Sequence, residues 1–135
     1  MVKIYNNIIP FKGFLAITIW PFIFIKKKLR ETFDVIDERH ENIHGEQQKE
    51  MLPIGIAIAV VLAVCNCGWW SLLALPIFFW WYLVEWLIKW AYYRNSHTAY
   101  KNIGFEREAF DNERDIVYLY NRKPFAWFDY IFKNG

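Results

Sequence analysis

Two histidines four residues apart, in the segment HENIH at positions 40–44, are the residues of this chain best suited to chemistry. On a helix, side chains at i and i+4 lie on one face, so His40 and His44 would project together. Two imidazoles at that spacing can bind one Zn²⁺ ion, and Glu41 beside them can take a proton from a water molecule that the metal activates. The HExxH pattern therefore predicts a hydrolytic zinc site. The alternative is a solvated polar helix whose histidines bind nothing.

A catalytic zinc ion needs a third protein ligand, and the sequence offers one near its C-terminal end. A helix beginning after Gly104 would place Glu106 and Glu113 on one face, seven residues apart. Glu106 is the natural third ligand, and Glu113 could accept a hydrogen bond from a zinc-binding histidine. The alternative is a surface helix whose Glu and Arg side chains pair in solvent.

Three further residues are candidates for supporting roles. Gln48 lies four residues beyond His44 and could orient substrate or a ligand. The alternative is a solvated glutamine with no role at the site. His97 or Tyr100 could donate to the oxyanion that forms when water attacks a carbonyl. The alternative for this pair is to anchor the chain at a membrane interface.

An uncharged run from Met51 to Val84 indicates a membrane protein. As one straight helix this run would be ~51 Å long, well beyond a hydrocarbon core of ~30 Å. It should therefore turn, and the segment CNCG at 65–68 is the only stretch suited to turning. We expect a membrane hairpin formed by residues 51–65 and 69–93, with a kink at Pro76.

Charge is segregated along the chain although the net charge is only +2. Basic residues at 26–30, at Lys89 and at Arg94 fall on the same side of the predicted hairpin. The positive-inside rule makes that side cytoplasmic, with the candidate site facing it, in an inner (cytoplasmic) membrane. A uniform basic patch and nucleic-acid-binding motifs are absent, so we expect no nucleic-acid partner.

Residues 14–25, FLAITIWPFIFI, are apolar but too short to span a membrane comfortably. Their Ile and aromatic content and Pro21 favour two short strands, or one bent strand, at the membrane interface. A re-entrant or short spanning helix is the alternative. Residues 1–12 are expected to be a polar lead.

The remaining segments are expected to be helical. Asp34 or Thr32 would cap a helix over 34–50 that carries HENIH, and Pro53 would kink that helix or start a new one. We expect a helix over 105–120 that carries Glu106, and an interfacial tail over 124–133. The predicted fold is a single, mainly α domain with a membrane hairpin and a short N-terminal β hairpin or interfacial segment.

HENIH followed by Glu106-Arg107-Glu108-Ala109 resembles the gluzincin metallopeptidases, especially integral-membrane ones of the CAAX-processing and heat-shock-protease type. In these, the first Glu of an ExxA-type helix is a zinc ligand, which implies Glu106 here. The wider sequence, over roughly residues 12–130, is similar to a family of small uncharacterised bacterial membrane proteins. Those enzymes usually have an Asp directly after this Ala, where this chain has Phe110. Asp111 or Asn112 could replace the support that this Asp gives to the zinc site.

The resemblance implies an integral-membrane zinc metallopeptidase that cleaves a peptide or membrane-protein substrate at the surface of the lipid bilayer. The chain is shorter than those enzymes and has fewer spans, which implies a homodimer or a larger membrane complex. The alternative is a non-catalytic membrane protein or complex subunit, with a structural metal site or none.

Overall fold

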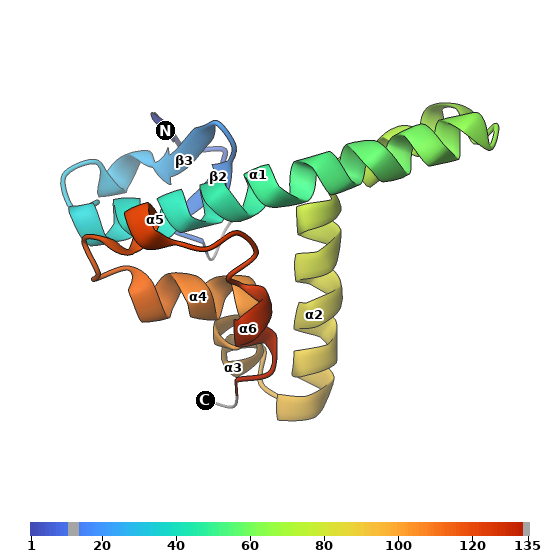
Figure 1. Ribbon diagram of the computed structural model, residues 1–135. Helices are drawn as coiled ribbons and strands as arrows, with labels where there is room; N and C mark the ends of the chain where they lie inside the picture. Colours follow the sequence, from blue (N-terminus) through green and yellow to red (C-terminus); the bar gives the residue numbers. More distant parts are fainter. Residues whose placement is uncertain (11–13, 134–135) are drawn as a thin grey trace.

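A computed structural model describes residues 1–10 and 14–133 and shows a mainly helical chain with one small sheet (Figure 1). This confirms the mainly α class with short N-terminal strands. The sheet packs on one side of the long helix α1, and α2 and α4 pack against α1 as well. The elements are β1 (Val2–Asn6), β2 (Ala16–Ile19), β3 (Phe22–Lys26), η1 (Lys27–Leu29), α1 (Val35–Val64), η2 (Gly68–Ala74), α2 (Ile77–Tyr93), α3 (Ser96–Lys101), α4 (Gly104–Asn112), α5 (Tyr118–Asn121) and α6 (Phe128–Ile131).

Helix α1 begins at a capping box. The Asp34 side chain accepts hydrogen bonds from the backbone N–H groups of Ile36 and Asp37, at 2.7 and 2.9 Å, and the Asp37 carboxylate accepts from Asp34 N–H at 3.1 Å. The helix then runs without interruption to Val64, so of the two alternatives for Pro53 the start of a new helix is wrong. Pro53 removes only its own hydrogen bond to the previous turn, and the bonds on either side keep the helix continuous.

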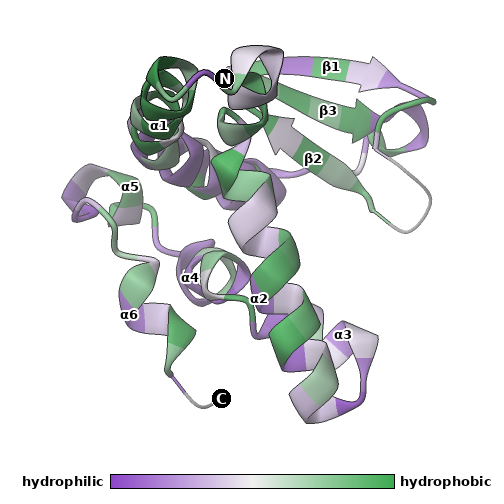
Figure 2. Ribbon diagram, turned by 90° about the vertical axis from the view of Figure 1, so that its right-hand side faces the viewer, coloured by the Kyte–Doolittle hydropathy of each residue, from purple (hydrophilic) through white to green (hydrophobic). Residues whose placement is uncertain are grey.

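The two halves of α1 have opposite surroundings. The first half buries polar residues such as His40, His44 and Gln47. The second half is hydrophobic, as the green end of α1 in Figure 2 shows. Its apolar side chains are exposed, up to 82% at Val64. This helix is long and apolar enough to cross a membrane, and η2 and α2 would make a second such segment only if taken together across a 65° bend.

The return path of the chain differs from the predicted hairpin. After the turn that follows Val64, η2 runs back along α1. Gly55 on α1 permits this close approach, because a Cβ atom at position 55 would lie only 2.7 Å from the carbonyl oxygen of Ala74. Around Pro76 the chain bends, and α2 then leaves α1 instead of following it (Figure 1). The predicted pairing of 51–65 with all of 69–93 is therefore not observed.

Residues 14–25 contain two strands, as predicted, and the alternative of a membrane helix is wrong. β2 and β3 are antiparallel and are joined at Trp20 and Pro21. β1 pairs in parallel with β3, giving the order β1-β3-β2. The expected polar lead over 1–12 thus contains a strand, because Val2–Asn6 finds its pairing partner 20 residues away, outside the reach of a local pattern. The strand β2 remains at the edge of the sheet.

The C-terminal part contains one further correction. The helix predicted over 105–120 ends at Asn112, and the side chain of Asp115 accepts from Val117 N–H to start a separate turn. In the predicted interfacial tail at 124–133, Phe125, Phe128 and Phe132 are exposed, whereas Trp127 packs into the core. Trp127 is 4% exposed, with its ring 4.6 Å from that of Phe105, and the two belong to a cluster with Met51, Phe78 and Ile103.

Candidate metal centre

The packing of α4 against α1 brings the three predicted ligands together. His40 Nε2 lies 3.1 Å from His44 Nε2, and the Glu106 carboxylate oxygens lie 3.3 Å from the former and 3.4 Å from the latter. Two donor atoms bound to one tetrahedral zinc ion are ~3.3 Å apart. The three side chains therefore have the mutual spacing of zinc ligands, with one donor atom from each inside a group 4.8 Å across.

The chemistry of this group also suits a metal ion. Glu106 Oε2 is buried and has no hydrogen-bond partner among the described residues, whereas Oε1 accepts from the Tyr82 hydroxyl at 2.9 Å. A buried carboxylate oxygen without a partner is costly unless a cation satisfies it. Two imidazoles and one carboxylate are, moreover, a donor set of catalytic zinc sites. The residues present thus fit Zn²⁺.

The ligands are also coupled electrostatically. Burial alone would raise the pKa of Glu106, but the adjacent histidines His44 and His40 outweigh it and hold that pKa well below its usual range. Burial alone would lower the pKa of His44, but the Glu106 carboxylate raises it to about 9. Without a metal ion, a proton on the histidines balances the negative charge of Glu106. A bound cation would take the place of that proton.

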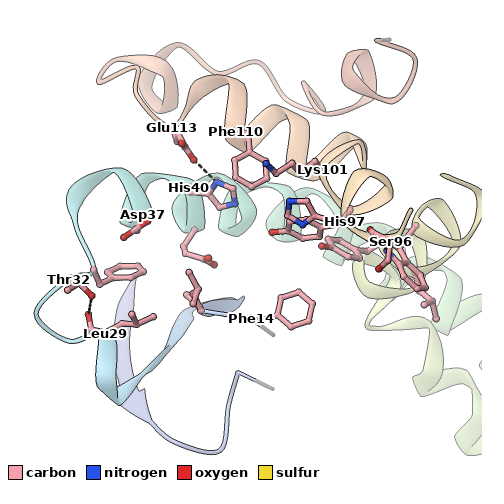
Figure 3. A pocket seen from close by; sticks show the side chains of 18 residues that line it. Phe14, Leu29, Thr32, Asp37, His40, Ser96, His97, Lys101, Phe110 and Glu113 are labelled. Carbon is pink, nitrogen blue, oxygen red and sulfur yellow. Dashed lines mark hydrogen bonds and ion pairs between the residues drawn. The ribbon is translucent and has the colours of Figure 1, made fainter. Parts of the chain in front are cut away.

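A second layer of hydrogen bonds orients both imidazoles. His40 Nδ1 lies 2.9 Å from Glu113 Oε2, the contact that Figure 3 marks with a dashed line. His44 Nδ1 lies 2.8 Å from Gln47 Oε1. With an acceptor at each Nδ1, both Nε2 atoms face Glu106, and they are the nitrogens that can bind a metal ion once the proton shared with Glu106 has left. Glu113 was suggested by the sequence; Gln47 was missed, although its position one turn after His44 could have indicated it.

Glu41 lies beside the ligands but does not belong to them. Its carboxylate Oε2 accepts a 2.7 Å hydrogen bond from the Thr18 hydroxyl, whose own residue is 2% exposed. Thr18 comes from strand β2, so the sheet positions this carboxyl group. Thr18 was not singled out from the sequence, because the contact joins residues 23 apart in the chain.

A cavity of about 1110 Å³ opens on the site (Figure 3). His40 and Glu41 form part of its wall, together with side chains from β2, α2 and α3. The rest of its lining is largely apolar and includes Phe14, Leu29, Phe33, Leu83, Trp86 and Phe110. A cavity of this size accommodates several residues of an extended peptide, or a comparable ligand, next to the metal ligands.

His97 and Tyr100 both line this cavity, from α3. Their rings are stacked with centroids 6.4 Å apart. Burial and the negative charge of Glu106 raise the pKa of Tyr100 well above its usual value, so its hydroxyl remains a hydrogen-bond donor. Both residues are therefore placed where they can contact a ligand in the cavity.

Gln48 and Asn112 are placed away from the metal ligands. The Gln48 side chain accepts from Trp20 N–H at 2.8 Å and donates to the carbonyl of Thr18 at 2.7 Å, and so binds the free edge of β2. Asn112 donates to the Glu108 carbonyl and to the Tyr130 hydroxyl. The structure gives both side chains packing roles, in place of the zinc-site roles suggested by the sequence.

We expect detergent-purified protein to hold about one zinc ion per chain after dialysis, measured by atomic emission. His40→Ala and Glu106→Ala should lose it, because each leaves only two protein ligands. His97→Ala is the matched control, since it changes a histidine in the same cavity outside the ligand group. Equal metal content in all four proteins would contradict the site.

Glu113→Ala should weaken zinc binding about 10- to 100-fold without abolishing it, the usual effect of removing a hydrogen-bond partner of a ligand. Competition with a chromogenic chelator measures this affinity. Glu46→Ala, which removes an exposed carboxylate paired with Lys49 on α1, should leave the affinity unchanged.

No family model, curated protein or solved structure matches this chain in searches of all three kinds. The geometry of the site and the sequence motifs are therefore the basis on which we infer a function.

Proposed function

We propose that this chain is an integral-membrane zinc metallopeptidase that hydrolyses a peptide bond near the membrane surface. The observation that carries the proposal is the convergence of His40, His44 and Glu106, with an orphaned carboxylate oxygen, beside a large cavity that His40 and Glu41 line. The match of HENIH and the following ExxA segment to the gluzincin pattern supports the same reaction.

A zinc ion bound at this position would polarise the substrate carbonyl and lower the pKa of a water molecule. Glu41 is the base that would take the proton from that water. Because the Thr18 hydroxyl bonds Oε2, the other oxygen of Glu41 is left to accept the proton. The same carboxyl group can then donate the proton to the departing amine. Tyr100 and His97 are placed to donate to the oxyanion.

The edge of β2 offers a way to hold an extended substrate. Leu15 C=O accepts from Lys26 N–H, so the backbone groups of the next residue, Ala16, point away from β3. Gln48 occupies the adjoining part of this edge, at Thr18 and Trp20. Ala16 also lines the cavity, where a peptide could add as a further strand.

The apolar surfaces support a position of this site at a membrane. The exposed second half of α1 and the exposed face of α2 present Val, Ile, Leu and Trp side chains, which lipid would cover. The polar half of α1 that carries the ligands then lies at the bilayer surface. We place it on the cytoplasmic side of a bacterial inner membrane from the basic residues near Lys26 and Arg94.

The competing function is a non-catalytic membrane subunit with a structural metal. Structural zinc sites have four protein ligands. Among the described residues only three side chains form the group, and the nearby carboxylate of Glu113 bonds Nδ1 of His40 instead of completing it. An open fourth position favours the enzyme.

Glu41→Gln should retain zinc and lose at least about 100-fold in hydrolysis, because the general base is removed while the metal ligands remain. The probe is a pool of internally quenched peptides with bulky apolar residues, in detergent micelles, compared with and without a chelator. Glu46→Gln is the control. Full activity in Glu41→Gln would remove this residue from the mechanism, and zinc binding without cleavage of any peptide would favour the structural role.

Ala16→Pro should reduce kcat/KM for long peptides more than for dipeptides. The substitution deletes an N–H that faces away from β3, so the sheet keeps its ladder while the substrate loses a partner. Circular dichroism establishes that the fold is retained, and an equal loss for short and long peptides would argue against strand addition.

A further inference from the structure

The fully buried side chain of Gln47 connects a metal ligand to a buried ion pair. Its Oε1 lies 2.8 Å from His44 Nδ1. Its Nε2 donates to the carbonyl of Phe105 and to the Glu108 carboxylate, both at 3.0 Å. Gln47 and Glu108 are each 0% exposed, so no solvent competes for these contacts.

These partners determine which way the Gln47 amide points. A backbone carbonyl and a carboxylate accept hydrogen bonds but cannot donate them, so the atom facing both must be the NH₂ group. Its Oε1 is then directed at His44 and can only accept. His44 must therefore carry a hydrogen on Nδ1, so that Nε2, which faces His40 and Glu106, is the nitrogen available to a metal ion.

The Glu108 carboxylate is itself held from the C-terminal segment. Arg122 donates to Oε1 through Nε at 2.5 Å and to Oε2 through a terminal nitrogen at 3.1 Å, and the Tyr118 hydroxyl donates to Oε1 at 2.9 Å. Arg122 also pairs with Glu50 on α1. This guanidinium keeps the buried carboxyl group an acceptor, which is the state that orients Gln47.

We propose that Gln47 is a positioning residue for the metal centre, and that Glu108 and Arg122 act on His44 through it. The inference rests on the proposed zinc site and extends it to a segment 78 residues beyond His44 in sequence. Removing Gln47 leaves Glu108 bonded to Arg122 and Tyr118, so the ion pair survives while the imidazole loses its acceptor. The effect of the substitution therefore falls on the metal and not mainly on folding.

Gln47→Leu tests this with little change of volume. We expect zinc affinity to fall about 10- to 100-fold in chelator competition, with an altered absorption spectrum of the Co²⁺-substituted protein. Glu50→Gln is the matched control. It weakens the ion pair of Arg122 without touching Gln47 and should change the thermal midpoint of the metal-free protein but not the zinc affinity.

Gln47→Glu provides a second test. It puts a carboxylate against the Phe105 carbonyl and the Glu108 carboxylate, where the wild-type amide donates, and should weaken zinc binding because an acceptor and a like charge replace the donor.

The outcomes separate the inference from the function on which it rests. A wild-type chain that binds no Zn²⁺ overturns both. A wild-type chain that binds Zn²⁺ while Gln47→Leu binds it equally well, with an unchanged Co²⁺ spectrum, overturns the positioning role alone. Loss of affinity in Glu50→Gln equal to that in Gln47→Leu would show a general packing effect and also overturn it.

Discussion

A carboxylate buried between two imidazoles is the interaction on which this structure depends. Glu106 is 4% exposed and one of its oxygens has no hydrogen-bond partner among the described residues. Burying such a charge is unfavourable unless a cation or a proton compensates it, and His40 and His44 lie where either can be shared. The surrounding contacts follow from this requirement, because Glu113 and Gln47 each orient one imidazole so that its free nitrogen faces the carboxylate. Stability and the proposed metal binding would therefore be coupled in one place, the contact of α1 with α4.

Helix α1 joins this polar centre to an apolar surface. Its first half buries His40, Glu41 and Gln47, whereas its second half exposes Val60, Val61 and Val64. A soluble protein would place these residues the other way round. The arrangement is favourable where lipid surrounds the second half, and the change of polarity near Met51 would then put the proposed metal ligands at the bilayer surface. The proposed hydrolysis would there have access to water and to substrates that are held in the membrane.

The sequence predicted local features well and long-range ones poorly. The His40/His44 spacing, the cap at Asp34 and the strands within 14–25 each follow from residues near one another in the chain, and the structure contains them. Strand β1, the contact of Thr18 with Glu41, and the burial of Trp127 depend on segments 20 or more residues apart, which no local pattern encodes. The expectation that Pro53 could start a new helix failed for another reason. The loss of one hydrogen bond does not end a helix whose neighbouring bonds are intact.

Two residues of the C-terminal segment support the proposed metal centre from behind α4. A metal centre needs its ligands held by a second layer of contacts. Trp127 packs against Phe105 in the core, and Arg122 donates to the Glu108 carboxylate. Because Glu108 lies two residues after Glu106 on α4, the same short helix presents the proposed ligand on one side and receives this support on another. The proposed site would therefore depend on Arg122 and Trp127 as well as on the three residues that would bind the metal.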